Sequence, residues 1–258
     1  IMVRFVAFAI FAAVFVAVRS DLLQAARASR PGLQILRSLL LVSEILIFAA
    51  ALRSLSLPLT HALFLTFPLM ITALSVPVLG EPVGWRRWLA VVVGFIGMLV
   101  ILRPGIGEFE PASLLILGCA LIFALYNLLT RMASRHDSFE TSILYVALIG
   151  AIVASLAGLA SWKAPTSHQW MLLTMLSIAG ISGHMLLIKA LEWAPAATLQ
   201  PLNYSMIVWG TLLSIIFFKT WPDGPTIIGA MIVIGSGLFI TWREQRRSRQ
   251  RPVRTATS

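Results

Sequence analysis

Nine hydrophobic stretches of membrane-spanning length fill most of this 258-residue chain, and short polar joints separate them. Hydrophobic residues make up 59% of the sequence and charged residues only 12%, whereas about a quarter of a typical soluble domain is charged. A soluble protein of this size could not bury so much apolar surface in one core, so lipid must surround most of the chain.

The stretches are predicted to be helices, because every backbone polar group in lipid needs an internal partner and no strand-like period of two is present. The predicted fold class is therefore an all-α polytopic integral membrane protein with nine visible transmembrane helices. Proline and glycine mark most of the joints. The predicted spans cover residues 2–18, 33–52, 57–79, 88–102, 112–130, 141–161, 169–189, 195–218 and 226–242.

Basic side chains predict the orientation of the chain. Fifteen of the 20 Lys and Arg residues fall on one side of the predicted spans, and six of those lie in the tail after Trp242. The side richer in Lys and Arg usually faces the cytoplasm, so we expect a cytoplasmic C-terminus. The same distribution explains the formal charge of +10 as a topology signal and argues against a nucleic-acid partner.

An internal repeat relates the two halves of the chain. A shift of 139 positions brings span ends and identical residues together, for example Thr72 and Thr211. We expect one repeat in residues 1–110, with four visible helices, a second in residues 111–242, with five, and a disordered basic tail at 243–258. Complete halves of five helices would be inverted relative to each other, which is how many secondary transporters achieve alternating access around a midplane site.

Two ionisable residues occupy nearly equivalent places in these repeats. Glu44 lies in the middle of its span, and the offset aligns it with Gly183, next to His184. Such side chains are costly at this depth and usually face a cavity or each other, so we predict a protonation-sensitive pair that contacts solute. The structural alternative is a helix-to-helix hydrogen bond, or an ion pair with Arg37, which precedes Glu44 by seven residues on the same helix face.

Other residues are candidates for the solute pathway. Gln200, Asn203 and Tyr204 form a polar stripe at helical spacing, which would contact a solute with hydrogen-bonding groups. Trp209, deeper in that span, would stack on a planar ligand or pack structurally. Pro68 is predicted to kink the third span and to act in gating.

The fifth span contributes two more candidates. Tyr126 and Asn127 are predicted to line the cavity wall, and Arg131 is interpreted as an anchor whose side chain reaches the headgroups. Glycines at helical spacing, including Gly97 and Gly180, are predicted to let helices approach closely.

Enzyme signatures are absent from the sequence. It contains no glycine-rich phosphate loop and no metal-ligand cluster, so we predict no catalytic residue, no cofactor and no metal. Two alternatives remain: a membrane-embedded enzyme acting on lipid, which would need a nucleophile and a base close together, and a scaffold that transports nothing. The expected partners are a small-molecule solute, membrane lipid and protons, and homodimerisation stays open.

Several motifs resemble those of one family. The first-half motifs are Leu-Gly-Glu-Pro-Val-Gly at 79–84, Arg86-Arg87-Trp88, Gly94-Phe95-Ile96-Gly97 and Arg103-Pro104-Gly105. The second-half motifs are Gly183-His184, Ala194-Pro195-Ala196, Tyr204, Trp209, Pro222-Asp223 and Gly235-Ser236-Gly237. This pattern covers essentially the whole chain and is similar to that of EamA-type transporters in the drug/metabolite transporter superfamily.

The resemblance implies ten helices in two inverted repeats, a central cavity and, in bacteria, an inner-membrane location. Such proteins move amino acids, nucleotide-related metabolites, vitamins, sugars or drugs, and the most similar subgroup includes transporters proposed for S-adenosylmethionine and riboflavin. Nine helices imply that the first helix of the pattern is missing here. Glu81 and Arg86 are predicted as a cytoplasmic gate pair or, alternatively, an end cap, although Thr220 stands where the second repeat usually has a matching glutamate.

Overall fold

The computed structural model describes residues 1–80, 84–103, 110–194, 199, 203, 205–219 and 221–250. Helices dominate these residues, and none of them forms a β-strand, which confirms the predicted all-α class. Three shorter apolar helices fall in predicted spans, at Trp88–Leu102, Val208–Phe218 and Gly224–Ile240. Six further segments are long and apolar enough to cross a membrane: Met2–Arg19, Pro31–Ala51, Leu57–Leu79, Ala112–Ala133, Phe139–Gly158 and Ser167–Trp193.

Two compact units divide the chain. Unit 1 consists of Ile1–Ser54 and Leu121–Ala196, and unit 2 consists of Leu55–Ala120 and Ala197–Ser258. Helix α7 (Ala112–Ala133) begins in unit 2 and ends in unit 1. Each unit combines helices from both predicted repeats, so the units describe packing, and the division into repeats at residue 110 stays a prediction.

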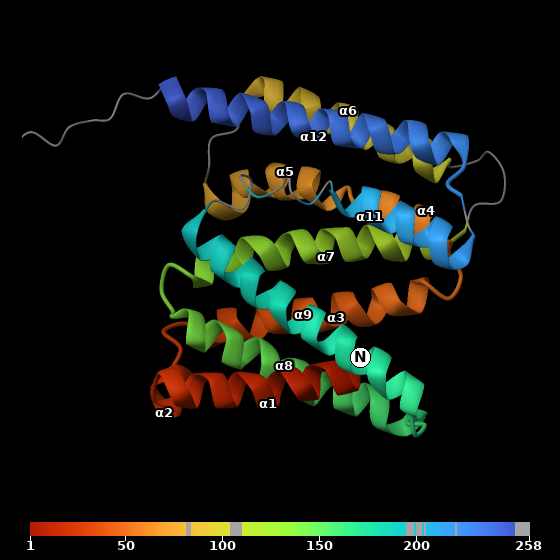
Figure 1. Cartoon of the computed structure of the whole chain (residues 1–258). Helices are drawn as coiled ribbons and strands as arrows, with labels where there is room; N and C mark the ends of the chain where they lie inside the picture. The colour runs from red at the N-terminus through yellow and green to blue at the C-terminus, as the bar shows by residue number, and fades with distance from the viewer. Residues whose placement is uncertain are drawn as a thin grey trace, which may run out of the picture. The chain divides into compact units, whose positions relative to one another are not determined.

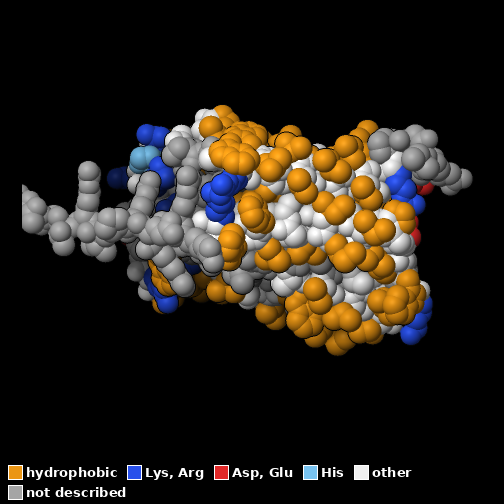
Figure 2. Space-filling model, turned by 90° about the horizontal axis from the view of Figure 1, so that it is seen from above, with side chains coloured by type: hydrophobic (Ala, Val, Ile, Leu, Met, Phe, Trp, Pro, Cys, Tyr) orange, Lys and Arg blue, Asp and Glu red, His pale blue; other side chains and the backbone are white. Residues whose placement is uncertain are grey.

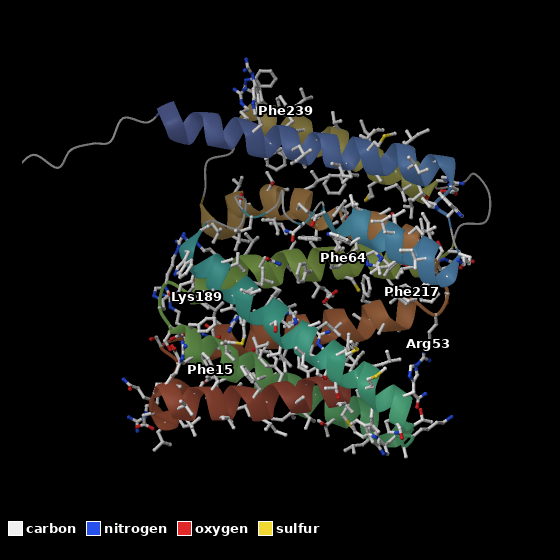
Figure 3. The ribbon with its side chains drawn as sticks, viewed as in Figure 1. Phe15, Arg53, Phe64, Lys189, Phe217 and Phe239 are labelled. Carbon is white, nitrogen blue, oxygen red and sulfur yellow. The ribbon has the colours of Figure 1, made fainter. Side chains whose placement is uncertain are left out.

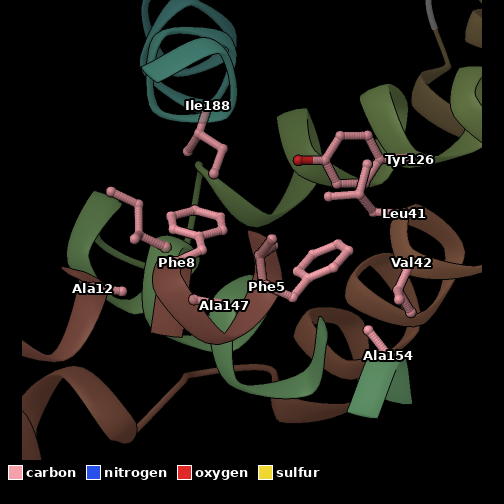
Figure 4. Close-up of a cluster of buried hydrophobic side chains, with 11 residues drawn as sticks. Phe5, Phe8, Ala12, Leu41, Val42, Tyr126, Ala147, Ala154 and Ile188 are labelled. Carbon is pink, nitrogen blue, oxygen red and sulfur yellow. The ribbon is translucent and has the colours of Figure 1, made fainter. Parts of the chain in front are cut away.

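Unit 1 is built around α8, which packs against both α1 and α3, while α9 packs against α1 and α8 (Figure 1). Its elements are α1 (Met2–Arg19), α2 (Leu22–Ala26), α3 (Pro31–Ala51), the second part of α7, α8 (Phe139–Gly158), the 3-10 turn η1 (Leu159–Ser161) and α9 (Ser167–Trp193). The buried core joins Phe5 and Phe8 of α1 to Leu41, Tyr126 and Ile188 (Figure 4). Side chains from α1, α3, α7, α8 and α9 therefore form this core together.

Local sequence signals set where the helices of unit 1 begin. The Ser138 hydroxyl oxygen accepts a hydrogen bond from the backbone N–H of Thr141 at 3.1 Å and caps the start of α8. Thr166 and Gln169 form a reciprocal capping box at the start of α9. Such caps satisfy backbone donors that have no partner within the helix.

The C-terminal end of α9 is held by Arg131 of α7. One guanidinium nitrogen of Arg131 donates to the carbonyl oxygens of Leu191 and Glu192, each at 2.7 Å. Lys189, labelled in Figure 3, bonds the Glu192 carboxylate at 2.9 Å and lies 5.0 Å from the centre of the Phe139 ring. Cations favour the carbonyl-rich end of a helix, so Arg131 acts as a helix cap, whereas the sequence indicated a membrane anchor.

In unit 2, helices α6 and α12 lie side by side over most of their length (Figure 1). The elements of unit 2 are α4 (Leu57–Phe64), α5 (Phe67–Leu79), α6 (Trp85–Leu102), the first part of α7, α11 (Ser205–Leu213), the π-helix η2 (Ser214–Phe218) and α12 (Gly224–Gln250). A Cβ atom on Gly97 would lie 2.9 Å from the carbonyl oxygen of Gly229. Glycine therefore permits the close contact between α6 and α12, as the sequence predicted.

The predicted third span is interrupted in the structure. Helices α4 and α5 are separated by a turn at Leu65 and Thr66, and the Thr66 hydroxyl donates to the Leu63 carbonyl oxygen at 2.8 Å. Pro68, which follows in the first turn of α5, has no N–H to donate to the Phe64 carbonyl. The kink predicted at Pro68 is therefore a break between two helices, and the proline starts the second of them.

The surface of the described residues is rich in exposed apolar side chains, as a lipid environment requires. Phe217 and Phe239, labelled in Figure 3, are 72% and 42% exposed. On the face shown in Figure 2, hydrophobic side chains cover the middle and Lys and Arg gather toward its ends. Helix α12 continues past the ninth predicted span to Gln250, and its Arg, Glu and Gln residues are good helix formers.

Candidate functional site

Three ionisable side chains meet inside unit 1, and we call them the charged cluster: Arg4 of α1, Glu44 of α3 and His184 of α9. The Arg4 Nη2 and His184 Nε2 atoms are 2.9 Å apart. Arg4 also attracts Glu44 electrostatically, and Glu44 is only 6% exposed. Arg4 therefore lies between Glu44 and His184 in its interactions. The sequence analysis singled out Glu44 and His184 but not Arg4.

The hydrogen bond between Arg4 and His184 fixes the protonation pattern of the imidazole. An arginine nitrogen can only donate, so His184 Nε2 must accept, and the neutral ring then carries its proton on Nδ1. The ring also lies nearly parallel to that of Phe8, at an angle of 14° with centroids 6.3 Å apart. A proton added to Nε2 would remove the acceptor and bring two cations into contact.

A glycine of α9 makes room for the Arg4 side chain. A Cβ atom on Gly180, one helical turn before His184, would lie 2.8 Å from the guanidinium carbon of Arg4. The guanidinium also approaches the Phe5 ring, at 5.9 Å from its centre. Gly180 was predicted from its spacing as a helix-packing residue, and the structure shows that it accommodates a charged side chain.

A second polar group surrounds Arg37, which is fully buried in α3. Its guanidinium donates to Gln34 Oε1 at 2.6 Å, to the Thr130 hydroxyl at 3.2 Å and to the Ser142 carbonyl oxygen at 2.6 Å. These three acceptors come from α3, α7 and α8. Arg37 therefore cross-links three helices, a role that its seven-residue spacing from Glu44 did not indicate.

The Arg37 group continues to the joint between α7 and α8. Gln34 Nε2 donates to one carboxylate oxygen of Asp137 at 2.8 Å, and the backbone N–H of Ser29 donates to the other at 2.6 Å. Partial burial opposes ionisation of Asp137, but these hydrogen bonds and the nearby Arg37 outweigh it and hold the pKa of Asp137 below its usual value. Asp137 is therefore ionised and lies at the end of the hydrogen-bonded group around Arg37.

Tyr126 and Asn127, the predicted cavity-wall residues, are both buried in α7. The Tyr126 ring stacks on Phe123 with centroids 5.9 Å apart. The Asn127 amide donates to the Phe123 carbonyl oxygen, one turn earlier, at 2.8 Å. Their role toward a solute remains a prediction.

The other predicted site residues are only partly described. Trp209 in α11 is 64% exposed, and Asn203 is partly buried. The Arg86 guanidinium lies 5.2 Å from the centre of the Trp85 ring. Three predicted residues lie outside the described part of the chain: Glu81, Gln200 and Tyr204.

Arg4 could have been found from the sequence by one signal. It is the only ionisable residue in the first predicted span, and such residues are functional candidates by default. Its position near the start of the chain favoured a simple end-of-span interpretation instead.

Among the described residues, no group of three or more His, Cys, Asp or Glu side chains could hold a metal ion.

Comparison with known proteins places this arrangement in context. The chain is 31% identical over 224 residues to the S-adenosylmethionine uptake transporter of Rickettsia prowazekii, covering 86% of this chain and 76% of that protein. It is 34% identical over 190 residues to the riboflavin transporter of Vibrio cholerae, covering 73% and 64%. A solved crystal structure shares the fold, with a TM-score of 0.70 and 20% identity over 95% of this chain and 87% of the other.

The sequence profile described as "EamA-like transporter family" matches residues 111–242. The named relatives are transporters, so the transport function and multi-pass membrane character predicted from the sequence are confirmed, and the lipid-modifying enzyme is not favoured. This chain belongs to the EamA-like transporter family.

Proposed function

We propose that this transporter moves a small metabolite that combines a planar nitrogen heterocycle with a zwitterionic amino-acid group, as S-adenosylmethionine does. The charged cluster would be the polar centre of its pathway. The observation that carries this proposal is that Arg4, within unit 1, hydrogen-bonds His184 of a second membrane-length helix and attracts Glu44 of a third. Ionisable side chains in such segments mark substrate or ion pathways by default.

The cluster has the right chemistry to exchange partners with such a solute. Arg4 can form a two-pronged contact with a carboxylate, and Glu44 can pair with an ammonium group. Because a zwitterion offers both groups, it could replace the attraction between Arg4 and Glu44 without leaving either charge unpaired. A solute with only one of the two groups would leave a buried charge unpaired, which is costly.

The relatives support an adenosyl-type solute, with a flavin as the second candidate. A transporter for S-adenosylmethionine from Rickettsia prowazekii covers most of this chain, and a riboflavin transporter from Vibrio cholerae is 34% identical over a shorter region. Riboflavin carries no amino-acid group, so it would gain less from Arg4 and Glu44. Amino acids are a third class of candidate solute, and the uptake assay below includes leucine for this reason.

The remaining sequence predictions complete this proposal. Gln200, Asn203, Tyr204 and Trp209 would contact the heterocycle, and Tyr126 and Asn127 would line the wall. Glu81, Arg86 and Pro68 would act in gating during alternating access between two inverted repeats. We also propose a bacterial plasma-membrane location with the C-terminus in the cytoplasm, in line with the distribution of Lys and Arg.

Uptake by proteoliposomes tests the proposal. We expect labelled S-adenosylmethionine to enter faster than riboflavin or leucine, and we expect Glu44→Gln to reduce its uptake by about tenfold or more, the equivalent of one lost charge contact. His168→Gln, an exposed histidine near the start of α9, is the control for His184→Gln. Unchanged S-adenosylmethionine uptake by both Glu44→Gln and His184→Gln would refute the site, and faster riboflavin uptake would favour the second candidate.

Proton coupling and homodimerisation are separate parts of the proposal. A proton on Glu44 would remove its charge and its attraction to Arg4, so a pH gradient would change uptake in the wild type and not in Glu44→Gln. An equal pH response in both proteins would exclude this coupling. Native mass spectrometry of the purified protein would show whether two copies associate.

A further inference from the structure

A polar cavity of about 290 Å³ lies within unit 2, where several helices begin or end. Its wall includes Ser56 before α4, Arg103 after α6, Glu110 and Ser113 at the start of α7, and Asp223 before α12. All these positions are joints or ends of apolar helices. The cavity therefore lies at the level where a helix leaves the hydrocarbon and meets the lipid headgroups.

An apolar groove of about 400 Å³ continues from this cavity. The two share four wall residues: Pro58, Trp221, Pro222 and Thr226. The groove is lined by α4, α11, η2 and α12, and along α12 it reaches from Thr226 to Ile234. A polar chamber and an apolar groove thus form one continuous amphipathic site.

The length of the site matches one membrane leaflet. Eleven residues separate Asp223 from Ile234, which corresponds to about 16 Å along a helix at 1.5 Å per residue. Half of a hydrocarbon core of about 30 Å is about 15 Å. A lipid with its headgroup at Asp223 would therefore keep its acyl chain beside the groove as far as the bilayer midplane.

The charges in the chamber favour one class of headgroup. Arg103 forms an ion pair with Asp223, and the Arg103 Nε atom is buried without an acceptor among the described residues. Partial burial opposes ionisation of Asp223, but hydrogen bonds from Thr226 and Arg103 keep its pKa below the usual value. With the Glu110 carboxylate, the chamber offers N–H donors for a phosphate and two carboxylates for an ammonium group.

We propose that this site binds a zwitterionic phospholipid with a primary ammonium headgroup, such as phosphatidylethanolamine. The two carboxylates and one guanidinium leave a net negative charge, which disfavours anionic lipids. A primary ammonium can donate hydrogen bonds to Glu110 and Asp223, whereas a quaternary ammonium cannot. The assignment is independent of the solute proposed above, because it requires only the membrane environment.

Native mass spectrometry of the purified chain with added lipids tests this site. We expect the wild type to bind phosphatidylethanolamine about tenfold more tightly than phosphatidylglycerol or phosphatidylcholine, the difference of one well-placed polar contact. Glu110→Gln should lose that preference, and Ala230→Phe should weaken all three lipids by filling the groove. Matched controls are Glu140→Gln, which does not line the chamber, and Ile228→Phe, on the exposed side of α12.

Several outcomes would overturn the assignment. Equal binding of the three lipids by the wild type would do so without any variant, and so would an unchanged preference in a folded Glu110→Gln protein. Displacement of bound phosphatidylethanolamine by S-adenosylmethionine or riboflavin would show instead that the chamber is a solute site. Melting temperatures measured in parallel show whether each variant is folded.

Discussion

Replacement of Arg37 by methionine should destabilise unit 1 by a measurable amount. Arg37 is completely buried and donates three hydrogen bonds, to Gln34, Thr130 and Ser142. Methionine has a similar length and no charge, so Arg37→Met removes the donors while filling much of the same volume. The substitution therefore tests the polar cross-link between α3, α7 and α8 with little change in packing.

The expected size of the effect follows from the acceptors that remain. Three hydrogen bonds from a charged donor have an upper limit of roughly 4.5–9 kcal/mol, but the variant also avoids the cost of a buried charge, which is several kcal/mol. The Thr130 hydroxyl can turn toward its own helix. Gln34 and Ser142 then lose a partner, at about 1–3 kcal/mol each, so we expect a net loss of about 2–4 kcal/mol.

Thermal unfolding in detergent measures this loss. For a chain of this size, about 1 kcal/mol shifts the melting temperature by about 2–4 °C, so Arg37→Met should melt about 5–15 °C below the wild type. Arg30→Met, at the exposed arginine that immediately precedes α3, is the control and should shift by about 1 °C or less. Equal melting temperatures for the two variants would refute the structural role assigned to Arg37.

Three further predictions concern close contacts and pH. Gly180→Val should lower stability by about 1–3 kcal/mol and should also lower uptake, because its side chain would displace the Arg4 guanidinium. In the control Gly183→Val, the added Cβ atom would meet no atom within 4 Å. Gly97→Leu should separate α6 from α12 and lower the melting temperature, since its Cβ would lie 2.9 Å from a backbone oxygen. Asp137 has a lowered pKa in the folded protein, so its stabilisation is present above about pH 4, the unfolded value, and is lost as pH falls through the folded pKa. The melting temperature of the wild type should therefore drop more steeply than that of Asp137→Asn as the pH falls below about 4.

Each of these predictions has a result that contradicts it. Equal losses in Gly180→Val and Gly183→Val would mean that Arg4 does not occupy the space beside α9. A folded Gly97→Leu protein with wild-type stability would contradict the close approach of α6 and α12. Parallel pH profiles of the wild type and Asp137→Asn would show that the hydrogen bonds to this carboxylate add nothing to stability.

The sequence predicted the helices well because their signals are local. Apolar length, proline and glycine located the spans, and the shorter helices in unit 2 overlap them almost completely. The packing partners were not predictable in the same way, because α8 contacts α1 and α3, which lie more than 80 residues earlier in the chain. The role of Arg131 was missed for the same reason, since its acceptors are carbonyl oxygens about 60 residues away.

The candidate site shows the same limit more sharply. The depth of Glu44 and His184 within apolar spans was readable from the sequence and made both candidates for a cavity or for contact with each other, and their role toward a solute stays a prediction. The repeat offset compared their two helices with each other and contained no information about α1, which supplies Arg4. Burial is a property of one segment, whereas the identity of the partner depends on how three segments pack.

The two polar groups of unit 1 differ in a way that bears on transport. Arg37 donates to a backbone carbonyl of α8 and to side chains of α3 and α7, so it joins three helices at once. The contact between Arg4 and His184 joins two side chains on separate helices, and neither end involves a backbone group. A shift of α9 against α1 could break this contact without unfolding either helix, whereas a comparable shift at Arg37 would break three hydrogen bonds at once. Movement in unit 1 should therefore be concentrated between α1 and α9, with α3 and α8 held together by Arg37.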